Sequence, residues 1–252
     1  MNIVDVNKEN VTEKGFFCYM SKRKSEGYKR KMRWLEDRFD EGIKIKMLDL
    51  KQGGRGFIEY IPGKFAWRAV NAENYLLIHC IWVAGQSKGK GYSKHLLNEC
   101  VEDAKKSGMK GVAVVTSEGN WLVGKKFFLK HGFESVDQHP PFELMVKKFG
   151  FCPSPSFSGD FEERLRAYSK GLTIVHSGQC PYIVAAVNAA LDAAKTLGIE
   201  ANMVELKSSK EIRELSPSPY GAFSIVYKGK LISYHSLAKK ELTKNLKDID
   251  GN

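Results

Sequence analysis

The chain has 252 residues, of which 42% are hydrophobic and 27% charged, the composition of an ordinary globular protein. This length accommodates one large domain or two modest domains of roughly 100–200 residues each. Of the formal net charge of +11, residues 1–149 hold most, with 27 Lys and Arg against 18 Asp and Glu, which indicates either an anionic partner or a basic surface that is only solvated.

Several classes of protein are excluded. The first residues, MNIVDVNKEN, hold no long apolar run behind a basic start, so we expect no signal peptide. No segment approaches the roughly 20 apolar residues of a membrane helix, so we expect no membrane partner. The five cysteines are widely spaced and form no CxxC pair, which argues against a disulfide framework and a zinc site. We therefore expect a cytoplasmic protein without a metal.

Apolar spacing predicts a mixed arrangement of strands and helices up to residue 149. A first helix is predicted around residues 32–39, and a later helix has apolar residues spaced by three and four from Leu96 to Ala104. Because strands outnumber helices and only one strand–helix–strand unit is clear, we expect the α/β (α+β) class, with a mixed sheet flanked by helices. The predicted strands are 43–50, 56–61, 74–84, 111–117 and 142–149, with a short helix at 121–128.

A second patterned region follows residue 150. The segment GFCPSPSFSGD is rich in Pro, Ser and Gly and predicts a linker. We expect domains at 1–149 and 171–252, joined by a linker at 150–170. The second domain is predicted to follow the order strand, helix, strand, helix, two hairpin strands and helix, over residues 172–176, 181–197, 202–206, 209–215, 223–227, 231–234 and 237–247.

The sharpest local feature is the segment 83–93, which follows an apolar strand and opens an amphipathic helix. Unpaired N–H groups and the helix dipole at such a position bind anions. Gly89 and Gly91 have no Cβ to keep a phosphate from the backbone, and Lys88 and Lys90 add positive charge. A helix start whose basic residues simply face water explains the segment equally well. The spacing matches neither a Walker A loop nor the dinucleotide-binding fingerprint.

The segment Gln86-x-x-Gly89-x-Gly91 resembles the Gln/Arg-x-x-Gly-x-Gly/Ala signature of the GNAT superfamily of N-acetyltransferases. The resemblance covers about residues 43–149 and involves three separate motifs. One flanking motif is the strand end Ile81-Trp82-Val83 before the loop. The other follows the loop and consists of the strand 112–116, Asn120 and the final segment Lys130-His131-Gly132-Phe133.

This resemblance implies an enzyme that moves an acetyl group from acetyl-CoA, its co-substrate, to an amine by direct transfer in a ternary complex. The backbone of Ile81, Trp82 and Val83 is expected to pair with the pantetheine arm, because the strand splays from its neighbour at a bulge. Asn120 is expected beside the sulfur. The pyrophosphate is expected at the main-chain amides after Gln86, namely those of Lys88, Gly89, Lys90, Gly91, Tyr92 and Ser93.

Acetyl transfer to an amine needs a base and a donor for the developing oxyanion. Glu59, Glu73 and His79 are the candidate bases, and the Val83 N–H is the candidate donor. A structural role explains these residues at least as well as a catalytic one, with Glu59 as an outward-facing strand residue and His79 as a histidine buried in the core. Phe128 stands where many relatives place a Tyr that protonates the leaving thiolate, so that acid is missing here.

Other residues are weaker candidates for the acceptor side of the cleft. The basic stretch from Lys22 to Arg33 lies where family members bind the acceptor, and it either attracts an acidic acceptor or forms a solvated helix face. Tyr60, Trp67 and Arg68 are further candidates. The acceptor itself stays open among amines, aminoglycosides, amino acids, peptides and protein lysines, and so does the oligomeric state.

The second domain contains Cys180-Pro181-Tyr182 between a predicted strand and a predicted helix, which resembles the Cys-Pro-Tyr-Cys of glutaredoxin-like thioredoxin folds. A helix N-terminus favours the thiolate, so Cys180 is a candidate reactive thiol. Ile183 replaces the second cysteine, and the cis-proline typical of that fold is missing, which favours a degenerate or substrate-shaping domain. The tandem resembles GNAT proteins with a YoaP-like C-terminal domain.

The sequence therefore supports one main function and two alternatives. The main function is N-acetyl transfer. The first alternative is a monothiol module acting through Cys180, with a first domain that senses acyl-CoA without catalysis. The second is nucleic-acid binding by the basic part of the chain, which we do not expect because the aromatic and basic residues are not interleaved.

Overall fold

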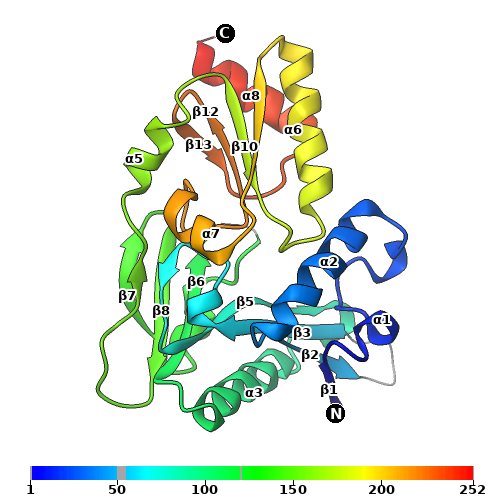
Figure 1. Cartoon of the computed structure of the whole chain (residues 1–252), viewed down its shortest axis with the longest axis vertical. Helices are drawn as coiled ribbons and strands as arrows, with labels where there is room; N and C mark the ends of the chain where they lie inside the picture. The colour runs from blue at the N-terminus through cyan, green and yellow to red at the C-terminus, as the bar shows by residue number, and fades with distance from the viewer. Residues whose placement is uncertain (1, 50–54, 120, 252) are drawn as a thin grey trace. The chain divides into compact units, whose positions relative to one another are not determined.

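The computed structural model describes residues 2–49, 55–119 and 121–251 (Figure 1). The chain divides into two compact units, and two short segments from its N-terminal part are counted with the second unit. Unit 1 comprises residues 1–23, 32–66 and 70–157, and unit 2 comprises residues 24–31, 67–69 and 158–252.

Unit 1 is built on a mixed sheet, as the sequence predicts. Over the described residues it has seven strands, and β5 and β6 are its parallel pair, whereas the other neighbours are antiparallel. A short ribbon joins β4 (Val70–Asn71) to β9 (Ser156–Phe157). The strands of the large sheet, in spatial order, are β1 (Asn2–Val6), β2 (Lys44–Asp49), β3 (Arg55–Pro62), β5 (Tyr75–Ala84), β6 (Gly111–Ser117), β8 (Phe142–Lys148) and β7 (Glu134–His139).

Helices and short 3-10 turns connect these strands. The long helix α3 lies along one face of the sheet and contacts β3, β5 and β6 (Figure 1). The helices are α1 (Val11–Lys14), α2 (Glu26–Asp40), α3 (Tyr92–Lys106) and α4 (Lys125–Leu129), and the 3-10 turns are Met20–Lys22, Gly63–Phe65 and Gly85–Ser87.

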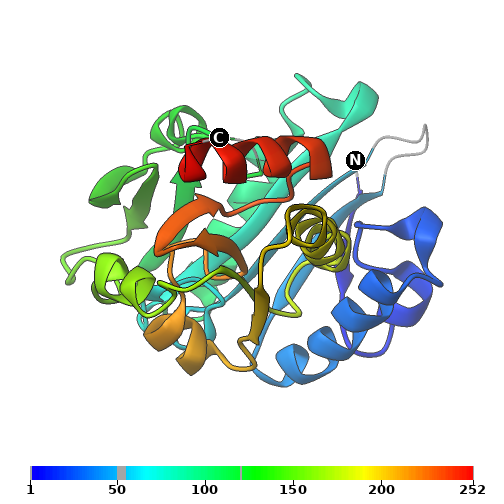
Figure 2. The same cartoon turned by 90° about the horizontal axis from the view of Figure 1, so that it is seen from above.

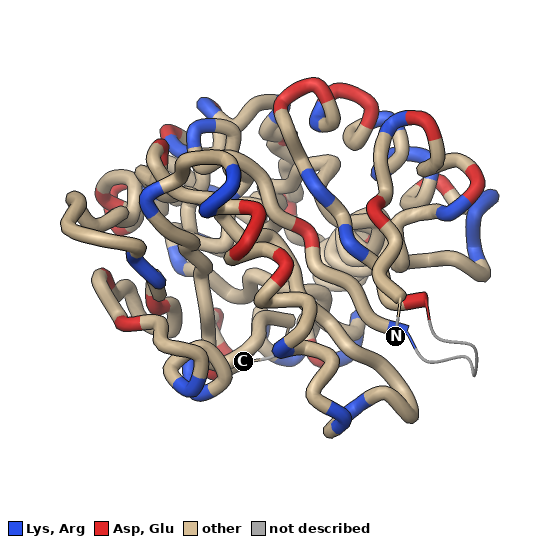
Figure 3. The backbone as a smooth tube through the Cα atoms, turned by 90° about the horizontal axis from the view of Figure 1, so that it is seen from below, with Lys and Arg blue, Asp and Glu red and all other residues tan. Residues whose placement is uncertain are grey.

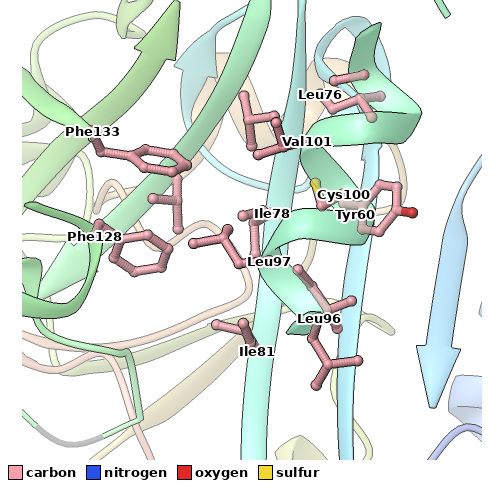
Figure 4. Close-up of a cluster of buried hydrophobic side chains, with 14 of the residues drawn as sticks. Tyr60, Leu76, Ile78, Ile81, Leu96, Leu97, Cys100, Val101, Phe128 and Phe133 are labelled. Atoms are coloured by element: carbon pink, nitrogen blue, oxygen red, sulfur yellow. The ribbon is translucent and has the colours of Figure 1, made fainter. Parts of the chain in front are cut away.

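The main core of unit 1 lies between α3 and the sheet (Figure 4). In β3, Ile58 and Tyr60 enter this core, as period-two alternation requires, and Glu59 between them turns to the other face. The predicted apolar face of α3 is confirmed, since its members are all buried. They are Leu96, Leu97, Cys100, Val101 and Ala104.

The sequence analysis does not predict two strands of the large sheet. The edge strand β7 reads ESVDQH and stays exposed or half-buried, so it has no apolar face that a hydropathy pattern could reveal. The edge strand β1 reads NIVDV and is also mostly outside the core. The predicted helix at 121–128 begins only at Lys125, with Gly124 as its N-cap residue in extended conformation.

Unit 2 follows the predicted order of elements. Its sheet has the order β11-β10-β12-β13 over the described residues, with β10 and β11 parallel and the other pairs antiparallel. Helices α6 and α8 lie side by side (Figure 2). The elements are α5 (Phe161–Arg166), β10 (Leu172–His176), α6 (Ile183–Leu197), β11 (Ala201–Glu205), α7 (Ser209–Leu215), β12 (Phe223–Tyr227), β13 (Lys230–Ser233) and α8 (Lys239–Asp250).

A polar network ties α3 to β2 and β3. The Asp103 carboxylate on α3 accepts hydrogen bonds from Tyr60 Oη at 2.6 Å and from Lys44 Nζ at 3.0 Å. Lys46, which is buried, lies 3.6 Å from Asp103 and also pairs with Glu99. Burial alone would raise the pKa of Asp103, but the hydrogen bonds from Tyr60 and Lys44 and the charge of Lys46 hold it below its ordinary value of 3.8.

We expect Asp103→Asn to lower the free energy of unfolding by about 2 kcal/mol at pH 7, because the asparagine cannot pair with the lysines. Since the folded-state pKa is lowered, this contribution is present above pH 3.8 and is lost as the pH falls through the folded-state pKa. Urea denaturation of both proteins from pH 7 to pH 3 measures the difference. Glu102→Gln, which removes the neighbouring exposed ion pair with Lys105, is the control and should change stability by less than about 0.5 kcal/mol. Equal pH dependence of the two variants would contradict the assignment.

Candidate active site

The parallel strands β5 and β6 separate halfway along their length. Their pairing runs only from Tyr75 opposite Gly111 to Ile78 opposite Val114. Beyond that point β6 continues along β8, and β5 continues along β3. Among the residues that the structure describes, no strand therefore pairs with this edge of β5 from residue 79 to residue 84. The splay predicted from the family resemblance is confirmed.

A β-bulge marks the point of separation. On β3, Glu59 and Tyr60 are consecutive, but their partners on β5 are Cys80 and Ile78. His79 is therefore the extra residue of β5, and the insertion twists the strand away from its neighbour. The expected bulge is thus found at one of the candidate bases.

The loop after β5 presents main-chain amides to solvent. Lys88 N–H donates to the Gly85 carbonyl at 3.2 Å, so this amide, which the sequence analysis included in the anion site, is already used. In the part of the chain that the structure describes, the amides of residues 89–93 have no hydrogen-bond acceptor. They lie at or just before the N-terminus of α3, where the helix dipole is positive, and amides in such a position can bind an anion.

Glycines fix the path of this loop. Gly85, Gly89 and Gly91 have φ angles of +60°, +77° and +77°, a region that residues with a side chain rarely adopt. The space where a Cβ would project from each is open. Gly91 is the N-cap residue of α3 and has no side chain to cap the helix, so the first amides stay available. Gln86, Lys88 and Lys90 are exposed around them.

The three residues of the strand end before the loop alternate between the two faces of the sheet. Ile81 and Val83 are 4% and 9% exposed and join the core under α3, whereas Trp82 is 45% exposed on the opposite face. Lys88 Nζ lies 5.7 Å from the centre of the Trp82 ring, a cation–π distance. At the other end of the loop, Tyr92 and Ser93 are half-buried in the first turn of α3.

Two of the candidate bases form a pair. His79 Nδ1 lies 3.1 Å from Glu59 Oε1, and both residues are buried. Trp34 of α2 lies beside the imidazole, with 6.2 Å between ring centres. When Glu59 is ionised it accepts from Nδ1–H, and this tautomer makes Nε2 the basic nitrogen. The pair lies at the point where β5 leaves β6.

Other candidates from the sequence lie elsewhere. Glu73 is exposed in the turn before β5. Tyr60 points into the core under α3, where it binds Asp103, so it cannot line the opposite face (Figure 4). Phe128 is fully buried and packs edge-on against Phe127 and Phe133, so its ring is part of the core. Asn120 lies outside the described residues.

Unit 2 gathers polar side chains at the end of β10, near Cys180. His176 Nδ1 lies 3.2 Å from Arg30 Nη2, and Arg30 also pairs with Glu205. Burial, and next to it the charge of Arg30, lowers the pKa of His176. Cys180 is half-buried, two residues before the N-cap of α6, and Ile183 is buried in the first turn. The sequence analysis missed the role of Arg30, because its basic stretch resembles a solvated helix face.

Arg68 and Trp67, which sequence reasoning assigned to the cleft, are buried within unit 2. Arg68 Nη1 donates to Gln179 Oε1 at 3.2 Å and to the Trp67 carbonyl, and its guanidinium lies 4.6 Å from the Tyr220 ring centre. Gln179 precedes Cys180 directly, so this arginine holds the turn that carries the thiol.

The structure gives further facts on charge, metals and membranes. Basic and acidic residues are interspersed along the backbone in Figure 3. Among the described residues, no three His, Cys, Asp or Glu side chains gather as metal ligands. No described helix combines the length and the hydropathy that crossing a bilayer requires.

Comparisons with known proteins agree with the resemblance seen in the sequence. The acetyltransferase (GNAT) family model matches residues 12–133. The uncharacterized N-acetyltransferase YoaP of Bacillus subtilis (strain 168) is 31% identical over 254 residues, covering 99% of this chain and 100% of that protein.

Solved structures of acetyltransferases also match. PaiA N-acetyltransferase from Thermoplasma acidophilum, solved in complex with coenzyme A, is 20% identical with a TM-score of 0.41, covering 59% of this chain and 100% of its own. Aminoglycoside 6'-acetyltransferase type Ii is 18% identical with a TM-score of 0.46, covering 61% of this chain and 100% of its own.

Removal of one member of the Glu59–His79 pair should leave the other buried without its partner. We expect Glu59→Leu and His79→Leu each to lower the free energy of unfolding by about 3 kcal/mol. The double variant should cost less than the sum of the two, because neither polar group then stays behind. Urea denaturation of the four proteins measures the coupling, and additive losses would show that the two side chains do not interact.

Proposed function

Because the chain belongs to the GNAT family of acetyltransferases, we propose that it is an N-acetyltransferase that moves the acetyl group of acetyl-CoA directly to an amine. The observation that carries this proposal is the row of five unpaired amides at residues 89–93, next to the unpartnered edge of β5. The amides would hold the pyrophosphate, and the strand edge would hold the pantetheine arm by main-chain hydrogen bonds. Lys88 and Lys90 would add charge, and Asn120 would lie near the sulfur.

In the proposed reaction, the acceptor enters as an ammonium ion and gives one proton to the Glu59–His79 pair. The amine nitrogen then attacks the thioester carbonyl carbon, and the negative charge that forms on the carbonyl oxygen is stabilised by an N–H donor, which we assign to Val83. When the C–S bond breaks, sulfur keeps the electron pair. The surplus proton on nitrogen neutralises this thiolate, so the buried Phe128 needs no acidic replacement.

Within the pair, we assign His79 as the base and Glu59 as its positioning residue. The 3.1 Å contact holds the imidazole through Nδ1, which directs the basic Nε2 away from the carboxylate. Their place at the bulge supports this role, because the pantetheine arm along the edge of β5 would bring the thioester toward the point where the strands separate.

For unit 2 we propose a thioredoxin-like domain. Its support is the sheet order β11-β10-β12-β13 with one parallel and two antiparallel pairs, together with the helices α6 and α8 side by side. Residues 171–252 would form this domain, after the GNAT domain 1–149 and the linker 150–170. Cys180 stays a proposed reactive thiol on the ground of its place before α6. A monothiol titration with iodoacetamide over pH 4–10 tests its reactivity.

We expect acetyl-CoA to raise the melting temperature by about 5–10 °C at a hundred times its Kd. Gly89→Asp should abolish this shift, because a side chain and a negative charge would then occupy the anion site. The matched control is Gly108→Asp, since Gly108 also has a positive φ, +69°, and open space at its Cβ, but follows the other end of α3. Differential scanning fluorimetry measures all three proteins. A shift retained in Gly89→Asp would remove the basis of the proposal.

His79→Gln should lower kcat by about 10²–10⁴-fold, with the acetyl-CoA shift in melting temperature retained. Glu59→Gln should lower it less, because the amide keeps a hydrogen bond to the imidazole. Free-thiol release from acetyl-CoA over a panel of amines measures the rates. Cys180→Ser should have little effect. If Cys180→Ser abolished turnover and His79→Gln did not, the assignment of the chemistry to unit 1 would be wrong.

A further inference from the structure

The sheet face opposite α3 carries an aromatic surface next to the Glu59–His79 pair. Trp82 on β5 lies opposite Phe57 on β3, and Glu59 lies two residues further along β3 on the same face. Phe17 stacks on Phe57, with ring centres 4.5 Å apart and planes inclined by 22°. We call Phe17, Phe57 and Trp82 the aromatic platform.

The exposure of Trp82 distinguishes it from its neighbours. The indole is 45% exposed, whereas Phe57 opposite it is 3% exposed. Lys88 lies over this indole, and the part of the ring that stays exposed can stack with another flat group. Phe57 of the platform and Glu59 of the Glu59–His79 pair are two residues apart along β3, a distance of roughly 7 Å.

The backbone at Phe17 and Tyr19 has an uncommon conformation. Phe17 and Tyr19 have φ angles of +79° and +55°, a region that residues other than glycine rarely adopt. Such residues persist where the surrounding structure holds them, often at ligand sites. Here the conformation brings the Phe17 ring against Phe57 rather than leaving it in solvent.

The charges around the platform disfavour an acceptor that carries a second cationic group. Lys88 lies over the Trp82 ring at 5.7 Å, and Lys22 lies over the Tyr19 ring at 5.5 Å. Between them, β3 and β5 carry one acidic residue, Glu59, which is buried with His79. An acceptor with one amine at this pair and an uncharged flat body fits these charges, whereas a polyamine would bring its other cations toward the lysines.

We propose that the acceptor is a primary arylalkylamine, whose ring lies on the aromatic platform while its amine reaches the Glu59–His79 pair. This inference rests on the proposed acetyltransferase function. It makes Trp82 a specificity-determining residue for the acceptor, in addition to the role of its backbone in binding the cofactor.

The test compares acceptors with the full chain at a fixed acetyl-CoA concentration, by free-thiol release. Phenethylamine should have a kcat/KM about three- to tenfold above that of cyclohexylethylamine, which has the same length and amine but no flat ring. Spermidine should be acetylated more slowly than either. Preference for spermidine or for cyclohexylethylamine would overturn the inference, and so would the absence of turnover with phenethylamine.

Variants of Trp82 test whether this residue causes the preference for an aromatic ring. Trp82→Ala should lower kcat/KM for phenethylamine about tenfold and remove its advantage over cyclohexylethylamine, and Trp82→Phe should restore part of it. Phe151→Ala, which removes a fully exposed aromatic ring outside the sheet, is the control and should change nothing. An unchanged preference in Trp82→Ala would overturn the inference.

The acetyl-CoA shift in melting temperature, measured on the same samples, distinguishes a failure of the acetyltransferase function from a failure of the acceptor assignment. If acetyl-CoA does not stabilise the wild-type protein, the acetyltransferase function itself fails. If it does and the ring preference is absent, the function stands and the arylalkylamine assignment is overturned.

Discussion

The site depends on main-chain hydrogen-bonding capacity that the sheet of unit 1 does not use. In a continuous sheet, β5 would pair on both edges, but the bulge at His79 ends its pairing with β6 after Ile78. The freed edge keeps its shape because β3 pairs with the other edge and because Ile81 and Val83 are anchored under α3. A strand held on one side only can accept an extended ligand on the other at little conformational cost.

The amides of residues 89–93 follow from the same chain path. The strand ends at Ala84, and glycines with positive φ turn the chain directly into α3, so the first turn of the helix begins without a capping side chain. The apolar face of α3 fixes the direction of these amides, since Leu96, Leu97 and Cys100 hold the helix against the sheet. The same amphipathic helix therefore provides core packing on one face and the unpaired amides of the proposed anion site at its N-terminus.

Much of this could be predicted from the sequence, and the limits have physical causes. Periodicity located the central strands and α3, and the glycine spacing located the loop, because both signals are local. The Glu59–His79 pair could not be derived in this way. A regular strand would place His79 and Cys80 on opposite faces, and only the register shift against β3 brings His79 to Glu59.

Arg30 and Arg68 were misread for a related reason, since their partners His176 and Gln179 lie more than a hundred residues away. The amide of Lys88 was assigned to the anion site because sequence does not show the 3-10 turn that occupies it.

Residues 67–69 belong to unit 2, although unit 1 supplies the chain on either side of them. The side chain of Arg68 is 1% exposed, and its partners Gln179 and Tyr220 come late in the sequence. During synthesis, Trp67 and Arg68 leave the ribosome long before those partners exist, so the nascent chain must carry them in solvent until unit 2 is complete. Truncation of the chain between residues 157 and 158 would separate Trp67 and Arg68 from the rest of unit 2. Unit 2 is thus completed by residues from both the early and the late part of the chain.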